Sequence, residues 1–135
     1  MEIILASASP RRRELLTQIG LTFRICVSDA EENVTKTEPE EIVMELSERK
    51  AEAVSGQILS GKAVDSAGAE IPLGDLLVIG ADTLVFLDGE QLGKPSDASD
   101  AFSMLSRLQG RSHQVYTGVT LIHIRDGAER GRRSF

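Results

Sequence analysis

The feature that most constrains the fold is a continuous apolar run, Leu76-Leu77-Val78-Ile79, near the middle of the chain. A strand with one face in solvent alternates apolar and polar residues, whereas this run has no polar position. It therefore predicts a central strand that is buried on both faces of a sheet. Helical patterns separate the predicted strands, so the sequence indicates the α/β class, with helices covering the sheet.

Two short strands and one helix are predicted for the N-terminal part of the chain. Ile3 to Ala6 has the pattern of a short buried strand, and Thr22 to Val27 alternates as a second strand. Between them, Ser9 is a suitable N-cap and Pro10 suits the first helical position. We therefore expect a helix from Pro10 to about Ile19, ended by Gly20.

A longer helix is predicted from a capping-box pattern, Thr37-Glu38-Pro39-Glu40, to about Gln57. Its apolar stripe includes Leu46 and Val54, and Lys50 falls on the same stripe, one turn from both. A lysine at such a position can extend its ammonium group to water. Alternatively, Lys50 points into a cleft towards an anion.

The region after this helix is expected to begin with a loop. Residues 60–75 are rich in Gly, Ala and Ser and indicate a loop insertion or a small hairpin within one domain that covers residues 1–135. Leu84 to Leu87, an Asp88-Gly89 turn and Gln91-Leu92 then predict a hairpin.

A third helix is predicted after this hairpin, capped by Ser96 or Asp97 and ended by Gly110. Its expected core face consists of four apolar residues, Ala101, Phe102, Leu105 and Leu108.

The last predicted strand is Val115 to Ile124, followed by a hairpin turn at Asp126-Gly127. Residues 128–135 offer almost no apolar side chain for a returning strand. We therefore expect an unpaired sheet edge there, and a fold that is incomplete at the C-terminus, because complete domains normally protect such edges.

The charge and the cysteine content narrow the classes of function. A net charge of -6 argues against nonspecific binding to nucleic acid or to a membrane surface, since the overall field repels polyanions. No apolar run approaches the roughly 18 residues of a membrane span. Cys26 is the only cysteine, so no intrachain disulfide can form and a cytoplasmic location is expected.

A serine- and arginine-rich segment, Ser7 to Arg13, lies between the first strand and the first helix. A helix N-terminus presents free N–H groups and the positive end of a dipole, which favours phosphate. Serine hydroxyls and arginine guanidinium groups add further donors. The alternative is a well-capped helix with solvated arginines.

Asp82 is placed where the apolar central strand gives way to polar residues. Ligands in α/β folds gather at the carboxyl ends of strands, where a carboxylate can bind Mg²⁺ or orient an attacking water. Alternatively, Asp82 ends the strand by bonding to nearby backbone. Thr83 beside it either contacts a base edge or simply favours the strand.

Other charged residues give weaker signals. The rigid Gly93-Lys94-Pro95 frame would aim Lys94, although an exposed turn lysine is the alternative. Glu31 and Glu32 could complete a metal site or be a solvated acidic loop. His113 and His123 are interpreted as structural, because His123 lies within a strand without an obvious acidic partner.

Together these segments resemble the Maf family of nucleotide pyrophosphatases. Five stretches carry the resemblance in one order, Ile4 to Arg12, Gly80 to Val85, Leu92 to Asp97, Leu105 to His113 and Tyr116 to Val119. The resemblance implies an inosine-triphosphatase-like α/β fold with a mixed, elongated sheet and a cleft between two lobes. It also implies Mg²⁺-dependent cleavage of a nucleoside triphosphate to the monophosphate and pyrophosphate, and a homodimer.

The resemblance further implies a role for individual residues. Asp82 would accept the proton of the attacking water, and Glu31 would join it at the metal. Arg12 and Thr83 fall at the base-specificity positions and resemble the branch that acts on dTTP and UTP. The expected phosphate-binding residues are Ser7, Arg11, Lys50 and Lys94.

Family members continue with a segment resembling Lys-Ala-Gly-x-Tyr-x-Ile-Gln-Gly, which supplies a specificity glutamine; this segment is absent from the present sequence. Three other functions compete with the enzyme. They are a non-catalytic nucleotide-binding module linked to septum formation, a metal-dependent phosphatase of another fold, and a protein-interaction scaffold.

Overall fold

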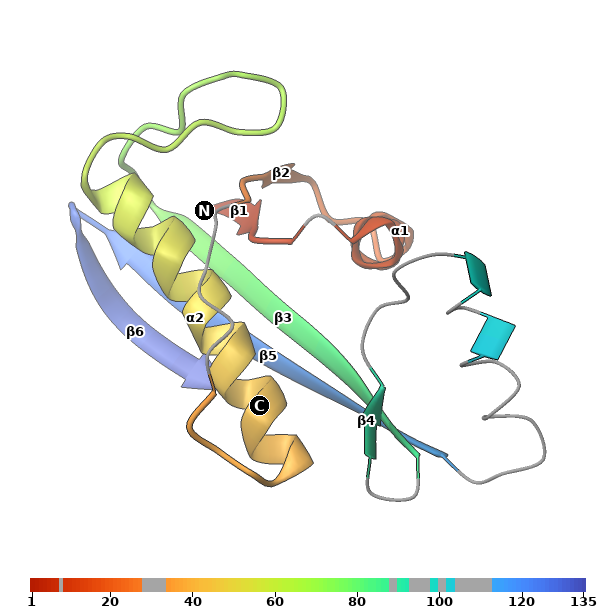
Figure 1. Cartoon of the computed structure of the whole chain (residues 1–135). Coiled ribbons are helices and arrows are strands. Elements are labelled where there is room, and N and C mark those ends of the chain that lie inside the picture. The colour runs from red at the N-terminus through yellow and green to blue at the C-terminus, as the bar shows by residue number, and fades with distance from the viewer. Residues whose placement is uncertain (8, 28–33, 88–89, 93–97, 100–101, 104–112) are drawn as a thin grey trace.

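The computed structural model describes residues 1–7, 9–27, 34–87, 90–92, 98–99, 102–103 and 113–135. Its described strands form one six-stranded mixed sheet (Figure 1). The main path runs in the order β2-β1-β3-β5-β6, and β4 pairs with β3 off this path. The α/β class and the mixed sheet that were predicted are therefore confirmed, whereas the cleft between two lobes stays an expectation.

The N-terminal strands and helix follow the sequence prediction closely. Strand β1 (Glu2–Leu5) lies between β2 (Phe23–Ile25) and β3, parallel to both. Helix α1 (Pro10–Gln18) begins at the predicted Pro10 with Ser9 as its N-cap. No residue of α1 is buried, so this helix lies at the periphery of the described fold.

Strand β3 (Leu76–Leu87) is the centre of the sheet and is one continuous strand of 12 residues. Its first half pairs with β1, and its whole length pairs antiparallel with β5 (His113–Arg125). Strand β4 (Glu90–Leu92) pairs with the end of β3, which confirms the predicted hairpin. The expectation that the strand ends at Asp82 was wrong, because β5 provides backbone partners on both sides of that residue.

Helix α2 (Pro39–Leu59) crosses one face of β3 and β5, as Figure 1 shows. It starts one residue later than the capping box predicted: Glu38, not Thr37, is the N-cap, and no side-chain bond caps it. Pro39 explains the shift, since a proline at the first helical position sets the helical φ without needing a cap bond.

Two glycines let α2 approach the sheet closely. A Cβ atom added at Gly80 would lie 2.8 Å from the backbone N of Ala51, and one added at Gly118 would lie 2.7 Å from the backbone N of Met44. Any side chain at either position would push the helix away. The two glycines therefore set the distance between α2 and the strands that carry the candidate site.

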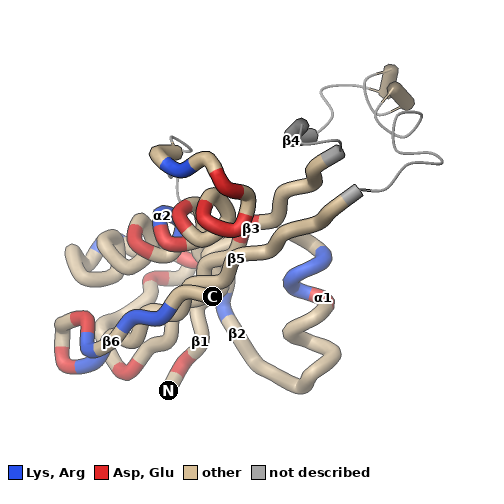
Figure 2. Tube along the Cα trace, turned by 90° about the horizontal axis from the view of Figure 1, so that it is seen from below, with Lys and Arg blue, Asp and Glu red and all other residues tan. Residues whose placement is uncertain are grey.

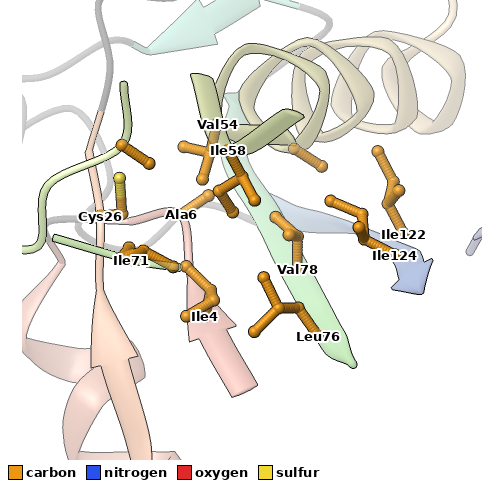
Figure 3. Close-up of a cluster of buried hydrophobic side chains, with 12 residues drawn as sticks. Ile4, Ala6, Cys26, Val54, Ile58, Ile71, Leu76, Val78, Ile122 and Ile124 are labelled. Atoms are coloured by element: carbon orange, nitrogen blue, oxygen red, sulfur yellow. The ribbon is translucent and has the colours of Figure 1, made fainter. Parts of the chain in front are cut away.

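The main core lies between α2 and the sheet (Figure 3). Ile4, Val78 and Ile122 from three strands meet Ile58 of α2 there, and all four side chains are fully buried. Cys26 packs in the same cluster. No helix within the described residues is long and apolar enough to cross a membrane.

Strand β6 (Ala128–Ser134) contradicts the expectation that no strand returns after Asp126-Gly127. The turn itself was predicted correctly, and both of its residues have positive φ, 53° and 75°. Such φ values match a two-residue hairpin turn. The turn directs the chain back along β5, and backbone pairing with β5 then holds β6 without apolar side chains. Figure 2 shows basic residues along β6.

Two other expectations concern loops and the third helix. Residues 60–75 form a small hairpin-like loop with a bridge between Val64 and Glu70, and Arg24 holds this loop through a 2.7 Å ion pair with Asp65. Most of the predicted third helix lies outside the described residues. Phe102, expected in its core face, is 74% exposed to solvent in the described part.

Candidate functional site

Asp82 and Lys50 form the centre of the site. The Nζ atom of Lys50 lies 2.7 Å from Oδ1 of Asp82 and 3.5 Å from the carbonyl oxygen of Ala81. Both side chains are largely shielded, with 26% of Lys50 and 13% of Asp82 exposed. The lysine on the apolar stripe of α2 therefore reaches an anion of the protein itself, the carboxylate of Asp82.

The second carboxylate oxygen of Asp82, Oδ2, differs from Oδ1 in its hydrogen bonding. Oδ2 is buried and has no hydrogen-bond partner among the described residues. A buried carboxylate oxygen without a partner is costly, so such atoms usually mark a place where water, a cation or a ligand binds. Asp82 therefore has one oxygen bound by Lys50 and one buried oxygen without a described partner.

Arg12 connects the loop after β1 to strand β3. Its Nη1 donates to Oγ of Ser7 over 3.2 Å, and its Nη2 donates to Oγ1 of Thr83 over 2.9 Å. Partial burial lowers the pKa of the Arg12 guanidinium, and the nearby negative charge of Asp82 opposes that effect. The sequence-predicted residues Ser7, Arg12, Thr83 and Asp82 are thus brought together around one point of β3.

Ser7 is oriented as a hydrogen-bond donor. Its Oγ accepts from the backbone N–H of Ser9 and from Arg12, both over 3.2 Å. A hydroxyl oxygen has two lone pairs and one hydrogen, so both lone pairs of Ser7 are in use and the hydrogen remains. The side chain is buried and close to the N-terminus of α1, where donors favour an anion.

The site occupies both faces of β3. Gly80, Asp82 and Leu84 face α2, since Gly80 approaches α2 closely and Leu84 packs against Val43 and Leu46. Successive side chains of a strand point to opposite faces, so Thr83 points away from α2. Asp82 and Lys50 therefore lie on one face, and Thr83 lies on the other.

An unpaired stretch of β3 edge joins these two faces. On the side away from β5, pairing with β1 ends at Ile79, and pairing with β4 begins at Val85. No other described strand pairs with residues 80–84 on that side. A ligand at this edge could therefore contact the Lys50–Asp82 pair and the Arg12–Thr83 pair at once.

The remaining predicted site residues are not brought into these contacts. Arg11 is exposed on α1, and Glu31 and Lys94 lie outside the described residues. Within the described ranges, no group of three or more His, Cys, Asp or Glu side chains could hold a metal ion. The partnerless Oδ2 of Asp82 is compatible with a cation ligand, while its predicted partner Glu31 remains untested.

Two residues depart from the sequence interpretation. His123 does have an acidic partner, because its Nε2 lies 2.6 Å from Oδ1 of Asp75. The sequence did not indicate this partner, since Asp75 precedes β3 and only the pairing of β3 with β5 brings the two residues together. The His113 side chain lies outside the described part. Thr117, which had been given no role, contacts Thr83 through a 3.1 Å Oγ1–Oγ1 distance.

Comparison with known proteins identifies relatives of the chain. It is 49% identical over 135 residues to a protein of Agathobacter rectalis named dTTP/UTP pyrophosphatase, covering 99% of this chain and 64% of that protein. A protein of the same name from Lachnoclostridium phytofermentans is 42% identical over 134 residues, with coverage of 99% and 61%. The chain thus spans about three-fifths of the length of these curated relatives.

A solved structure is also similar. It is a nucleoside-triphosphatase, or dITP/XTP pyrophosphatase, from Mycobacterium abscessus, with a TM-score of 0.44, 13% sequence identity and coverage of 99% of this chain and 72% of that one. This loose likeness adds nothing to the sheet topology described above. The family match is far more extensive, since the sequence agrees with the family described as Maf-like protein over residues 2–134. This match over nearly the whole chain shows that the chain belongs to the Maf-like protein family.

Proposed function

We propose that the protein hydrolyses a nucleoside triphosphate, dTTP or UTP, to the monophosphate and pyrophosphate. The observation that carries the proposal is the state of Asp82, with Oδ1 bound by Lys50 and Oδ2 buried without a partner among the described residues. A carboxylate with one oxygen held and the other without a described partner suits a general base that orients and deprotonates water.

The neighbouring groups suit the charge of a triphosphate. Hydrolysis of a phosphoanhydride depends on positioning and on neutralising oxygen charge more than on covalent chemistry by the protein. The Ser7 hydroxyl supplies an oriented donor close to the N-terminus of α1. Arg11 and Lys94 are proposed to add charge from the segments that precede and follow β3.

A bound Mg²⁺ is part of the proposal. Asp82 and Glu31 would hold the ion, and the buried carboxylate oxygen of Asp82 without a described partner supports this assignment. When bound, the ion would supply further neutralisation of the phosphate oxygens.

The preference for thymine and uracil rests on Arg12 and Thr83. Their side chains are hydrogen-bonded to each other beside Asp82, where a base could lie when its phosphates contact Ser7. The relatives named dTTP/UTP pyrophosphatase support the same preference. We also propose a cytoplasmic location and a homodimer, in line with the single cysteine and the family resemblance.

The test is product analysis with Mg²⁺ and a panel of nucleoside triphosphates, using a method that resolves pyrophosphate from orthophosphate. The proposal expects pyrophosphate with dTMP or UMP, at higher kcat/KM than for purine nucleotides. Orthophosphate would indicate a phosphatase instead. Stoichiometric nucleotide binding by the folded protein without any product would indicate a binding module.

A further inference from the structure

Thr117 lies directly opposite Thr83 in the pairing of β5 with β3. Cross-strand partners share one face of a sheet, so both side chains lie on the face away from α2. Their Oγ1 atoms are 3.1 Å apart, and both residues are exposed. The Tyr116 to Val119 stretch carries part of the family resemblance, yet the proposed function uses none of its side chains.

The hydrogen-bonding capacity of Thr83 depends on Thr117. Arg12 can only donate, so Oγ1 of Thr83 accepts its bond and keeps one lone pair and one hydrogen. If Thr117 donates, the second lone pair is used and Thr83 can only donate to a ligand. If Thr83 donates to Thr117, only a lone pair remains.

The structure contains a parallel arrangement at Ser7. There Arg12 and the N–H of Ser9 fill both lone pairs of the hydroxyl, which leaves its hydrogen for a ligand. Arg12 therefore donates from Nη1 to the Ser7 hydroxyl and from Nη2 to the Thr83 hydroxyl, and each hydroxyl has one further hydrogen-bond partner. At Thr83 that further partner is Thr117.

We propose that Thr117 is a positioning residue that donates to Thr83 and thereby fixes Thr83 as a hydrogen-bond donor towards the base. Arg12 and Thr83 then form a site made only of donors, which suits the carbonyl oxygen at position 4 of uracil and thymine. The amino group at the same position of cytosine would find no acceptor on the Arg12 or Thr83 side chain. This inference rests on the proposed function and specifies how its base preference arises.

The test compares UTP and CTP analogues with a methylene group between the α and β phosphates, which cannot be cleaved at that bond. Their Kd values are measured by calorimetry with Mg²⁺, so the readout does not depend on turnover. Thr117→Val removes the hydroxyl at nearly constant volume, whereas Thr117→Ser retains it. We expect Thr117→Val to reduce the preference for the UTP analogue by about threefold to tenfold, the range of one hydrogen bond.

Controls separate positioning from a structural role. Thr117→Ser is expected to keep the wild-type ratio of Kd values within about twofold, on the same scale of hydrogen-bond energies. In a Thr83→Val background, Thr117→Val should have no further effect on the ratio, because it acts through Thr83. Equal melting temperatures for Thr117→Val and the wild type would show that the fold is unchanged.

The outcomes distinguish this inference from the proposed function. The positioning role would be overturned, with the hydrolase left intact, by any of three results. The ratio of Kd values could be unchanged in Thr117→Val, or it could change as much in Thr117→Ser as in Thr117→Val. Thr117→Val could also change the ratio in the Thr83→Val background as much as it does in the wild type. Failure of the folded wild-type protein to bind either analogue would overturn the proposed function and this inference with it.

Discussion

Replacing Gly80 by alanine tests how closely α2 must approach β3. The added Cβ would lie 2.8 Å from the backbone N and 2.9 Å from the Cβ of Ala51, and closer still to the carbonyl oxygen of Ser47. Two of these three atoms belong to helix backbone and cannot rotate away. The helix would therefore have to move from the sheet by several tenths of an ångström or more.

The expected cost follows from this geometry. Overpacking of a well-packed core typically costs about 1–3 kcal/mol, and a collision with backbone falls at the upper end of that range. We therefore expect Gly80→Ala to lower the free energy of unfolding by about 3 kcal/mol. Because Lys50 precedes Ala51, the same movement would lengthen the 2.7 Å contact between Lys50 and Asp82 and reduce turnover.

The assay is urea unfolding followed by circular dichroism, with Gly56→Ala as the matched control. Gly56 lies in α2 and has nothing within 4 Å of an added Cβ. Its replacement should stabilise the protein by roughly 0.5–1 kcal/mol through helix propensity alone. If Gly80→Ala unfolded within about 0.5 kcal/mol of the wild type at an unchanged m-value, the close-packing argument would be refuted.

Three further predictions concern charge. Lys50→Ala should lower kcat/KM by about 100-fold, because Asp82 loses the cation that holds its Oδ1. It should also lower the free energy of unfolding by about 1–3 kcal/mol, since the shielded carboxylate is left without a partner. Early melting with normal specific activity would contradict a role of Lys50 in turnover. The Arg49 side chain and then the Thr35 backbone N–H lower the pKa of Glu45 from 4.5 to about 2. The contribution of Glu45 to stability is therefore present above about pH 4.5 and is lost as the pH falls towards 2. Glu45→Gln should make the free energy of unfolding depend less on pH in that window. If acid titrations followed by circular dichroism showed the same pH dependence for Glu45→Gln and the wild type, these contacts would be unimportant. Removing divalent cations with EDTA should abolish pyrophosphate release, and added Mg²⁺ should restore it; release that persists in EDTA would exclude the proposed metal role.

Local signals in the sequence predicted much of the fold. The apolar run at Leu76 identified the central strand, Pro10 identified the start of α1, and Asp126-Gly127 identified a hairpin turn. These features depend on a few neighbouring residues, which the sequence shows directly. Lys50 was singled out because it interrupts an apolar stripe, and the structure shows why, since its ammonium group contacts Asp82.

Features that depend on tertiary pairing were missed. Strand β6 has no apolar pattern because it is an exposed edge strand, held by backbone pairing with β5 and by contacts such as those of Ser134 with Thr120 and Glu48. Asp82 was placed at a strand end because polar residues follow Ile79, whereas β5 continues the pairing beyond it. No periodicity in the sequence specifies such a partner.

The same limit applies to the site. Ser7, Arg12 and Thr83 were predicted by family resemblance, but the guanidinium that joins both hydroxyls follows only from the tertiary fold, which brings the Arg12 side chain within reach of Thr83 on β3. Thr117 was overlooked because a threonine in a strand is ordinary, and its significance arises from the register that sets it opposite Thr83. The pairing of Thr117-Gly118 on β5 with Asp82-Thr83 on β3 is the signal that could have indicated a role for Thr117.

The most direct test of the central claim is pyrophosphate release from UTP by the wild type and Asp82→Asn, measured side by side with Mg²⁺. Asparagine keeps the shape of the side chain but cannot act as the base. The account predicts pyrophosphate and UMP from the wild type and a loss of about 10²–10⁴-fold in kcat for Asp82→Asn, with the fold retained. Turnover by Asp82→Asn at the wild-type rate would contradict the role assigned to Asp82.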